Sequence, residues 1–115
     1  MASQVDRDLI VAVSATDNVD EIKSLLDNGA SGDFVFEDEP SIPGELEGYS
    51  ALMVAARNGR KDVVELLLES GADPAVAGED FYPQMGPVHC AAKSGHPGCL
   101  ALLLNAVSSL NNYDL

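Results

Sequence analysis

The sequence has few aromatic residues and no tryptophan: three Phe and three Tyr occur among 115 residues. The core must therefore be built from Ala, Leu and Val, which suits closely stacked helices better than a β-sandwich. A composition of 46% hydrophobic and 22% charged residues is typical of a folded chain, and the length allows one domain at most. These features predict a single all-α domain over residues 1–115.

Positive charge is also scarce. Six Lys and Arg stand against nineteen Asp and Glu, which gives a formal net charge of -13 at pH 7. Such a chain repels phosphate backbones and anionic lipid surfaces. We therefore expect neither nucleic acid nor a membrane as a partner.

The sequence lacks long apolar runs and the features of a secreted, disulfide-linked protein. The longest apolar runs, residues 9–13 and 100–104, are far shorter than the roughly 20 residues that span a bilayer. The two cysteines, Cys90 and Cys99, stand in a chain whose first residues do not read as a signal peptide. We expect no membrane span, reduced thiols and an intracellular, cytoplasmic location.

An internal repeat organises the sequence. Residues 52–59 (LMVAARNG) return as residues 88–95 (VHCAAKSG), a shift of 36 positions. A second apolar stretch follows each block, VVELLL at residues 63–68 and CLALLL at residues 99–104, again 36 positions apart. Two elements recur together, which is typical of a protein built from stacked two-element units.

A looser copy precedes these two. Residues 25–30 (LLDNGA) mirror residues 67–72 (LLESGA), here at a shift of 42. The prediction is three units, at about residues 8–30, 48–74 and 84–107.

Each unit is predicted to be a helix hairpin. Ser50 can cap a short helix that ends near Gly59, and Lys61 opens a second helix with an apolar stripe at Val63, Val64, Leu66 and Leu67. Gly71 then provides the left-handed backbone that commonly ends a helix. The expected fold is a row of paired helices joined by turns.

This pattern resembles the ankyrin repeat, in which a Thr-Pro-Leu-His tetrapeptide, an Ala-Ala pair and Gly-His precede Val-Val-x-Leu-Leu-Leu-x-x-Gly-Ala-Asp. Residues 86–89 (GPVH) stand in the tetrapeptide position, Gly95-His96 in the Gly-His position, and residues 48–74 match nearly throughout. The resemblance covers about residues 8–107. It implies a solenoid of helix-turn-helix units with hairpin-like finger loops, and a protein-binding role.

Three departures mark the outer units. Asp17 replaces a family glycine, Pro97-Gly98 lies in the linker of the third unit, and Val107-Ser108 replaces its closing Gly-Ala. The boundaries of the outer units are therefore expected to be less regular.

The segment 31–47, the acidic insertion in the first finger, is predicted to be about nine residues longer than usual, because units one and two are 42 residues apart whereas the family period is about 33. It holds six acidic residues and no basic one, together with two prolines, and predicts an extended acidic loop. Three interpretations are open: a mobile, solubilising loop, an electrostatic attractant for a basic partner segment, or a calcium site. Calcium is the weakest, since the acidic spacing does not fit an EF-hand loop.

Two further segments leave alternatives open. The second finger, residues 75–85, carries the unusual sequence FYPQM, which either packs onto the helices beneath or forms a contact patch. The third unit is followed by no polar closing helix, although repeat arrays need capped ends. Either another chain covers that end or the sequence is a fragment of a longer array; self-association should then be sensitive to Leu103→Asp.

Candidate chemistry is limited to His89, Cys90, His96 and Cys99, which superficially suggest zinc or a Cys–His nucleophile. The resemblance places both histidines in structural positions of the repeat, with the His89 imidazole expected to hydrogen-bond backbone between repeats. Cys99 falls on an apolar stripe. We expect no metal, no cofactor and no enzymatic activity.

The resemblance implies a partner site on the concave side, made by finger tips and the exposed face of each first helix. It selects ten residues: Leu46, Glu47, Tyr49, Arg57, Asn58, Tyr82, Pro83, Met85, Lys93 and Ser94. For each of these the alternative is an ordinary solvated or locally packed side chain. Tyr49, Arg57 and Met85 are the strongest candidates, because aromatic, Arg and Met side chains are enriched in interfaces.

The expected function is therefore a scaffold or adaptor module that binds another protein, as a monomer or with weak self-association through the third unit. A structural or self-associating array within a larger ankyrin protein is the alternative.

Overall fold

The structure is a computed structural model that describes residues 3–16, 18–37, 40, 42–77 and 86–111, with the side chains of 110 and 111 left out. Within these residues it contains six α-helices, one short 3-10 helix and no strand, which confirms the all-α prediction. In chain order the elements are α1 (Gln4–Ala15), α2 (Val19–Asp27), η1 (Gly44–Leu46), α3 (Ala51–Asn58), α4 (Lys61–Glu69), α5 (Pro87–Lys93) and α6 (Pro97–Asn111).

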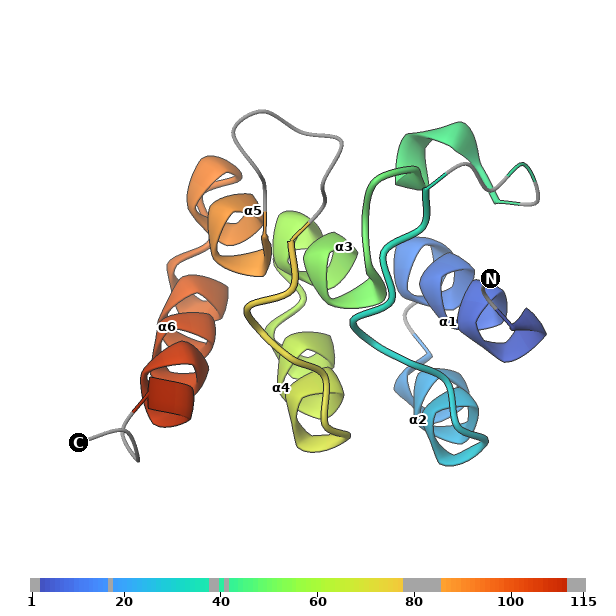
Figure 1. The fold of residues 1–115 in the computed structure, drawn as a ribbon, viewed down its shortest axis with the longest axis horizontal. Coiled ribbons are helices and arrows are strands. Elements are labelled where there is room, and N and C mark those ends of the chain that lie inside the picture. Colours follow the sequence, from blue (N-terminus) through green and yellow to red (C-terminus); the bar gives the residue numbers. More distant parts are fainter. Residues whose placement is uncertain (1–2, 17, 38–39, 41, 78–85, 112–115) are drawn as a thin grey trace.

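The helices form two layers (Figure 1). Helices α1, α3 and α5 lie side by side in an inner layer, and α2, α4 and α6 lie in an outer layer. Helix α3 contacts both α1 and α5, while α4 contacts both α2 and α6. The pairs α1–α2, α3–α4 and α5–α6 are called units one, two and three below.

Polar side chains cap the starts of α1, α2 and α3. The Ser50 hydroxyl accepts a hydrogen bond from the Met53 N–H at 3.2 Å, as predicted, and Ser50 is only 1% exposed. The Asn18 side chain accepts from the Glu21 N–H in the same manner, and Ser3 forms a reciprocal capping box with Asp6. Each cap satisfies N–H groups that the first turn of a helix leaves without a partner.

Gly59 joins the two helices of unit two with a backbone conformation and a close contact that both disfavour a side chain. Its φ of 74° is left-handed, and a Cβ placed there would lie 2.6 Å from the ring of His96. The glycine therefore permits both the turn and the close approach of unit three.

Apolar side chains from all three units form one core. The predicted core position Leu67 is fully buried, as are Ala55 and Ala56 of the small-residue pair that lets the helices approach. The largest fully buried side chains include Leu9, Ile10, Ile22, Phe36, Leu46, Leu52, Met53 and Leu103.

The insertion departs from the expected extended loop. Its residues Phe36, Ile42 and Leu46 are buried, and η1 lies beyond the inner layer at the top of Figure 1. The Phe36 N–H donates to the Tyr49 carbonyl at 3.0 Å, and the Gly48 N–H donates to the Phe36 carbonyl at 2.6 Å. Buried apolar side chains and backbone pairing thus attach the described part of the insertion to the common core.

None of the helices in the described residues is both long and apolar enough to cross a membrane.

Candidate functional site: the inner-helix surface

Tyr49 and Arg57 form the centre of the candidate site. The Arg57 guanidinium carbon lies over the Tyr49 ring, 4.8 Å from its centroid, and both residues are partly exposed. Tyr49 directly precedes the cap of α3 and Arg57 lies in its last turn. This cation–π contact, worth about 0.5–1 kcal/mol at an exposed site, favours this arrangement of the two side chains.

The backbone also fixes Tyr49. Its carbonyl accepts from the Phe36 N–H, and its own N–H donates to the Leu46 carbonyl at 3.1 Å. The folded insertion therefore positions the aromatic ring of the site.

Leu46 itself corrects the sequence-based selection. It is 0% exposed and lies in the core, so it supports the site from beneath instead of reaching a partner. Its neighbour Glu47 is exposed. The sequence did not separate the two because a short 3-10 helix, with no repeat to set its register, decides which side chain points inward.

Lys93 repeats the position of Arg57 in unit three. The two residues are 36 apart, each lies in the last turn of an inner helix, and Lys93 is exposed. Asn58 and Ser94, which follow them, are also exposed. The helix dipole favours a cation near a helix C-terminus. The positive charges of Arg57 and Lys93 are therefore stabilised at these positions even when no partner is bound.

Tyr82, Pro83 and Met85 lie outside the described residues, as does the FYPQM sequence of the second finger. Six of the ten selected residues remain as a described surface, which we call the inner-helix surface: Glu47, Tyr49, Arg57, Asn58, Lys93 and Ser94.

Three of the acidic residues that the structure describes in the insertion, Asp33, Glu45 and Glu47, differ in their surroundings. Asp33 is used internally: its carboxylate accepts from the Ser31 hydroxyl at 2.9 Å and from the Asp73 N–H at 2.7 Å, which ties the first finger to the end of unit two. Glu45 and Glu47 are exposed. Glu45 and Glu47 are therefore accessible from solvent, whereas the Asp33 carboxylate is engaged within the chain.

The two cysteines are buried structural residues. Burial raises the pKa of the Cys90 thiol, although the nearby Arg57 and Lys93 charges act in the opposite direction. Burial likewise raises the pKa of the Cys99 thiol. Both thiols therefore stay protonated at neutral pH, which disfavours them as nucleophiles.

His96 makes the kind of inter-unit backbone hydrogen bond that was expected of His89. Its Nε2 lies 3.0 Å from the Arg57 carbonyl, so Nε2 is the protonated nitrogen that donates across to α3. His89 is exposed on α5.

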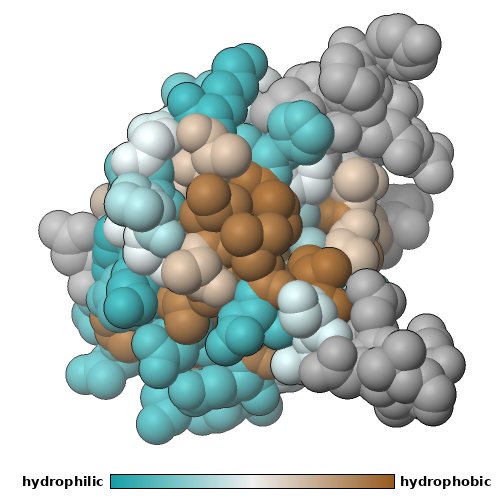
Figure 2. Space-filling view, turned by 90° about the vertical axis from the view of Figure 1, so that its left-hand side faces the viewer, coloured by the Kyte–Doolittle hydropathy of each residue, from teal (hydrophilic) through white to brown (hydrophobic). Residues whose placement is uncertain are grey.

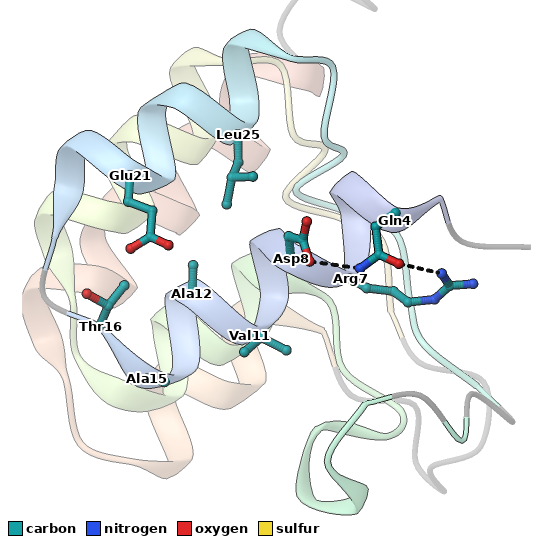
Figure 3. Close-up of a pocket in the computed structure, with 9 residues that line it drawn as sticks. All are labelled: Gln4, Arg7, Asp8, Val11, Ala12, Ala15, Thr16, Glu21 and Leu25. Carbon is teal, nitrogen blue, oxygen red and sulfur yellow. Dashed lines mark hydrogen bonds between the residues drawn. The ribbon is translucent and has the colours of Figure 1, made fainter.

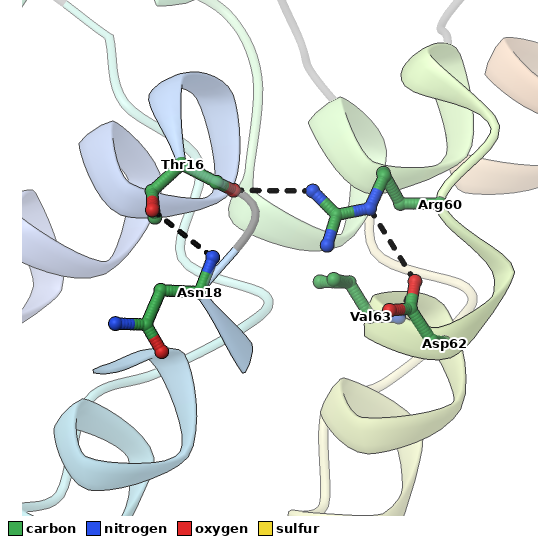
Figure 4. A network of polar contacts seen from close by, with 5 residues as sticks. All are labelled: Thr16, Asn18, Arg60, Asp62 and Val63. Atoms are coloured by element: carbon green, nitrogen blue, oxygen red, sulfur yellow. Dashed lines mark hydrogen bonds and ion pairs between the residues drawn. The ribbon is translucent and has the colours of Figure 1, made fainter. Parts of the chain in front are cut away.

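Arg60 plays the same role in unit two, which the sequence analysis missed (Figure 4). Its guanidinium donates to the Thr16 carbonyl at 3.1 Å and contacts Asp62 at 3.4 Å. Because Arg60 stands 36 residues before His96, the repeat itself was the signal that could have found it.

Comparison with known protein families identifies this fold. A family model for ankyrin repeats in three copies matches residues 6–78, and a model for a single ankyrin repeat matches residues 85–114. The chain belongs to the ankyrin-repeat family, whose members are generally protein-interaction modules.

Three larger proteins resemble the chain. The inactive serine/threonine-protein kinase TEX14 of Mus musculus is 33% identical over 97 residues, which cover 84% of this chain and 6% of that protein. The 2-5A-dependent ribonuclease of Homo sapiens is 33% identical over 75 residues, covering 65% of this chain and 9% of the ribonuclease. The mitochondrial disaggregase of Bos taurus is 36% identical over 110 residues, covering 96% of this chain and 14% of the disaggregase. The chain thus spans a small part of each relative.

Proposed function

We propose that this chain is a non-catalytic interaction module that binds a partner protein through the inner-helix surface. The arrangement of Arg57 over Tyr49 carries the proposal, because it presents an aromatic ring and a cation already held in place. Preorganised side chains lose little conformational entropy on binding, and Tyr and Arg are typical interface hot spots.

The charges around this pair suggest what the partner carries. Exposed Glu45 and Glu47 lie on the insertion side, whereas Arg57 and Lys93 follow one another along the inner helices. A partner segment with a basic portion facing the insertion and an acidic portion facing unit three would match both ends. The intracellular, cytoplasmic location stays a prediction.

A capture experiment with charge-matched variants tests the proposal. Tagged wild-type protein is compared with Arg57→Glu and with Lys23→Glu, an identical charge change on the exposed side of outer helix α2. Circular dichroism and thermal unfolding verify the fold of each variant.

We expect a protein that is retained by wild type and Lys23→Glu but lost with Arg57→Glu and with Tyr49→Ala. Equal loss with Lys23→Glu would mean that general charge, not this surface, governs retention. Retention of the same proteins by all four would place the partner site elsewhere.

A further inference from the structure

The outer end of unit three exposes an apolar face (Figure 2). Apolar side chains gather where α5 and α6 face away from the rest of the stack. Leu104 is 49% exposed, Ala92 is exposed, and Val88, Leu100 and Val107 are partly exposed. We call these five residues the end face.

Unit two shows what covers such a face. The residues 36 positions earlier, Leu52, Ala56 and Val64, are each 0% exposed, because unit three packs against them. Their counterparts Val88, Ala92 and Leu100 have the same apolar character without that cover. The end face is therefore of the kind that packs against a helix pair.

The backbone of α6 lacks the turn by which the chain passes from α4 toward unit three. Helix α4 ends at Glu69, and Gly71 then turns the chain back with a φ of 102°. Helix α6 instead continues through Val107, which occupies the position of Gly71, and reaches Asn111. The chain as described, through Asn111, therefore begins no helix pair that covers the end face, and we consider a second molecule as the cover.

The opposite end of the stack is a poor match for this face (Figure 3). Arg7, Asp8 and Glu21 line the groove between α1 and α2 there, and Asp8 accepts a hydrogen bond from Gln4 at 2.9 Å. Seating the end face of one copy on this groove would bury charged groups, which is costly. Head-to-tail stacking of copies is therefore disfavoured.

Two end faces can meet without that cost. Residues 86–111 contain no Asp or Glu, although the whole chain has a formal charge of -13. A pair of α5–α6 units would thus bring apolar side chains together with no facing carboxylates from these segments. We infer that the end face is a self-association surface that takes the end face of a second copy, about a two-fold axis.

The charge on the remainder of the chain sets the salt dependence. Two copies repel each other through their net negative charge, whereas the contact itself is apolar. Raising the salt from about 0.05 M to about 0.5 M screens the repulsion. Self-association should therefore tighten with salt, the opposite of a contact held by ion pairs.

Sedimentation equilibrium on the full chain, over a range of concentrations and at both salt levels, tests the inference. The variants are Leu104→Glu, Ala92→Glu and Val11→Glu, the last being the control: Val11 is 38% exposed, lies in the groove at the other end, and acquires the same charge. Because facing carboxylates repel and must be desolvated, Leu104→Glu and Ala92→Glu should each weaken the dimer at least about tenfold, and Val11→Glu much less.

A monomer at all concentrations in both salts would overturn the inference and leave a different protein, or a further repeat, as the occupant. A dimer weakened equally by Val11→Glu, or one that loosens with salt, would overturn it too, because the contact would then lie elsewhere or depend on charge. Thermal unfolding of each variant shows whether a loss of dimer is caused by misfolding. Two separate end-face positions are tested so that the inference does not depend on one variant that fails to fold. The result is independent of the partner test above, which concerns another surface.

Discussion

Units two and three carry nearly the same sequence pattern but have different surroundings. Unit two lies between two neighbours, and its inner helix is almost entirely buried, from Ala51 to Ala56. Among the described residues, unit three packs against unit two alone, and Ala92, the counterpart of buried Ala56, is exposed. The comparison teaches that the pattern specifies the helix hairpin, whereas the position in the stack decides what each apolar side chain contributes.

The largest expected effect concerns equivalent core leucines. Leu67→Ala and Leu103→Ala each remove a fully buried side chain, and such truncations cost about 2–5 kcal/mol. Leu67 should lie at the upper end, because both neighbouring units hold the surrounding cavity open, whereas unit three can relax toward solvent. Urea unfolding of both variants measures the difference; equal costs would show that a neighbour on the second side does not matter.

A smaller effect is expected at equivalent glycines. Gly59 and Gly95 have similar φ values of 74° and 76°, so an alanine strains both, by about 1–2 kcal/mol. Only at Gly59 would the new Cβ meet another side chain, the ring of His96, since nothing lies within 4 Å at Gly95. Gly59→Ala should therefore lower the melting temperature more than Gly95→Ala does. In a His96→Ala background, which lacks the ring, the difference in melting temperature between the two glycine variants should be smaller.

The smallest effect is a pH dependence. The folded pKa values of Cys90 and Cys99 are raised above the ordinary 9.0, so the folded state favours the protonated thiols. The stabilisation is complete below the unfolded pKa and declines as pH rises above it toward the folded values. Between pH 7 and about pH 9.5 the wild type should lose more unfolding free energy than a Cys90→Ala, Cys99→Ala double variant. If the unfolding free energies of the wild type and the double variant changed equally with pH, the two buried thiols would not be the source of the pH dependence.

The repeat made most of the fold predictable. The Ser50 cap, the turns at Gly59 and Gly71 and the buried stripe of α4 all follow from local pattern, and the structure agrees. The same logic could have corrected one expectation. Leu103 was expected to control self-association, but it is buried, as its counterpart Leu67 already implied.

The insertion was not predictable in this way. Phe36, Ile42 and Leu46 are separated by acidic residues and prolines, and no repeat sets their register. Their burial depends on contacts with distant parts of the chain, which a local pattern does not contain. For the same reason the sequence predicted Tyr49 and Arg57 separately as partner-contact residues, but it did not predict that Arg57 lies over the Tyr49 ring.

The pairing of Phe36 with Tyr49 links the insertion energetically to the proposed partner site. When the insertion opens locally, Tyr49 loses the hydrogen bond that holds its backbone, so only closed molecules present the intact surface. The apparent affinity for a partner is then reduced by the fraction of molecules that are open. Hydrogen exchange at the Phe36 amide would report that fraction directly, and substitutions inside the insertion would tune affinity without touching the partner.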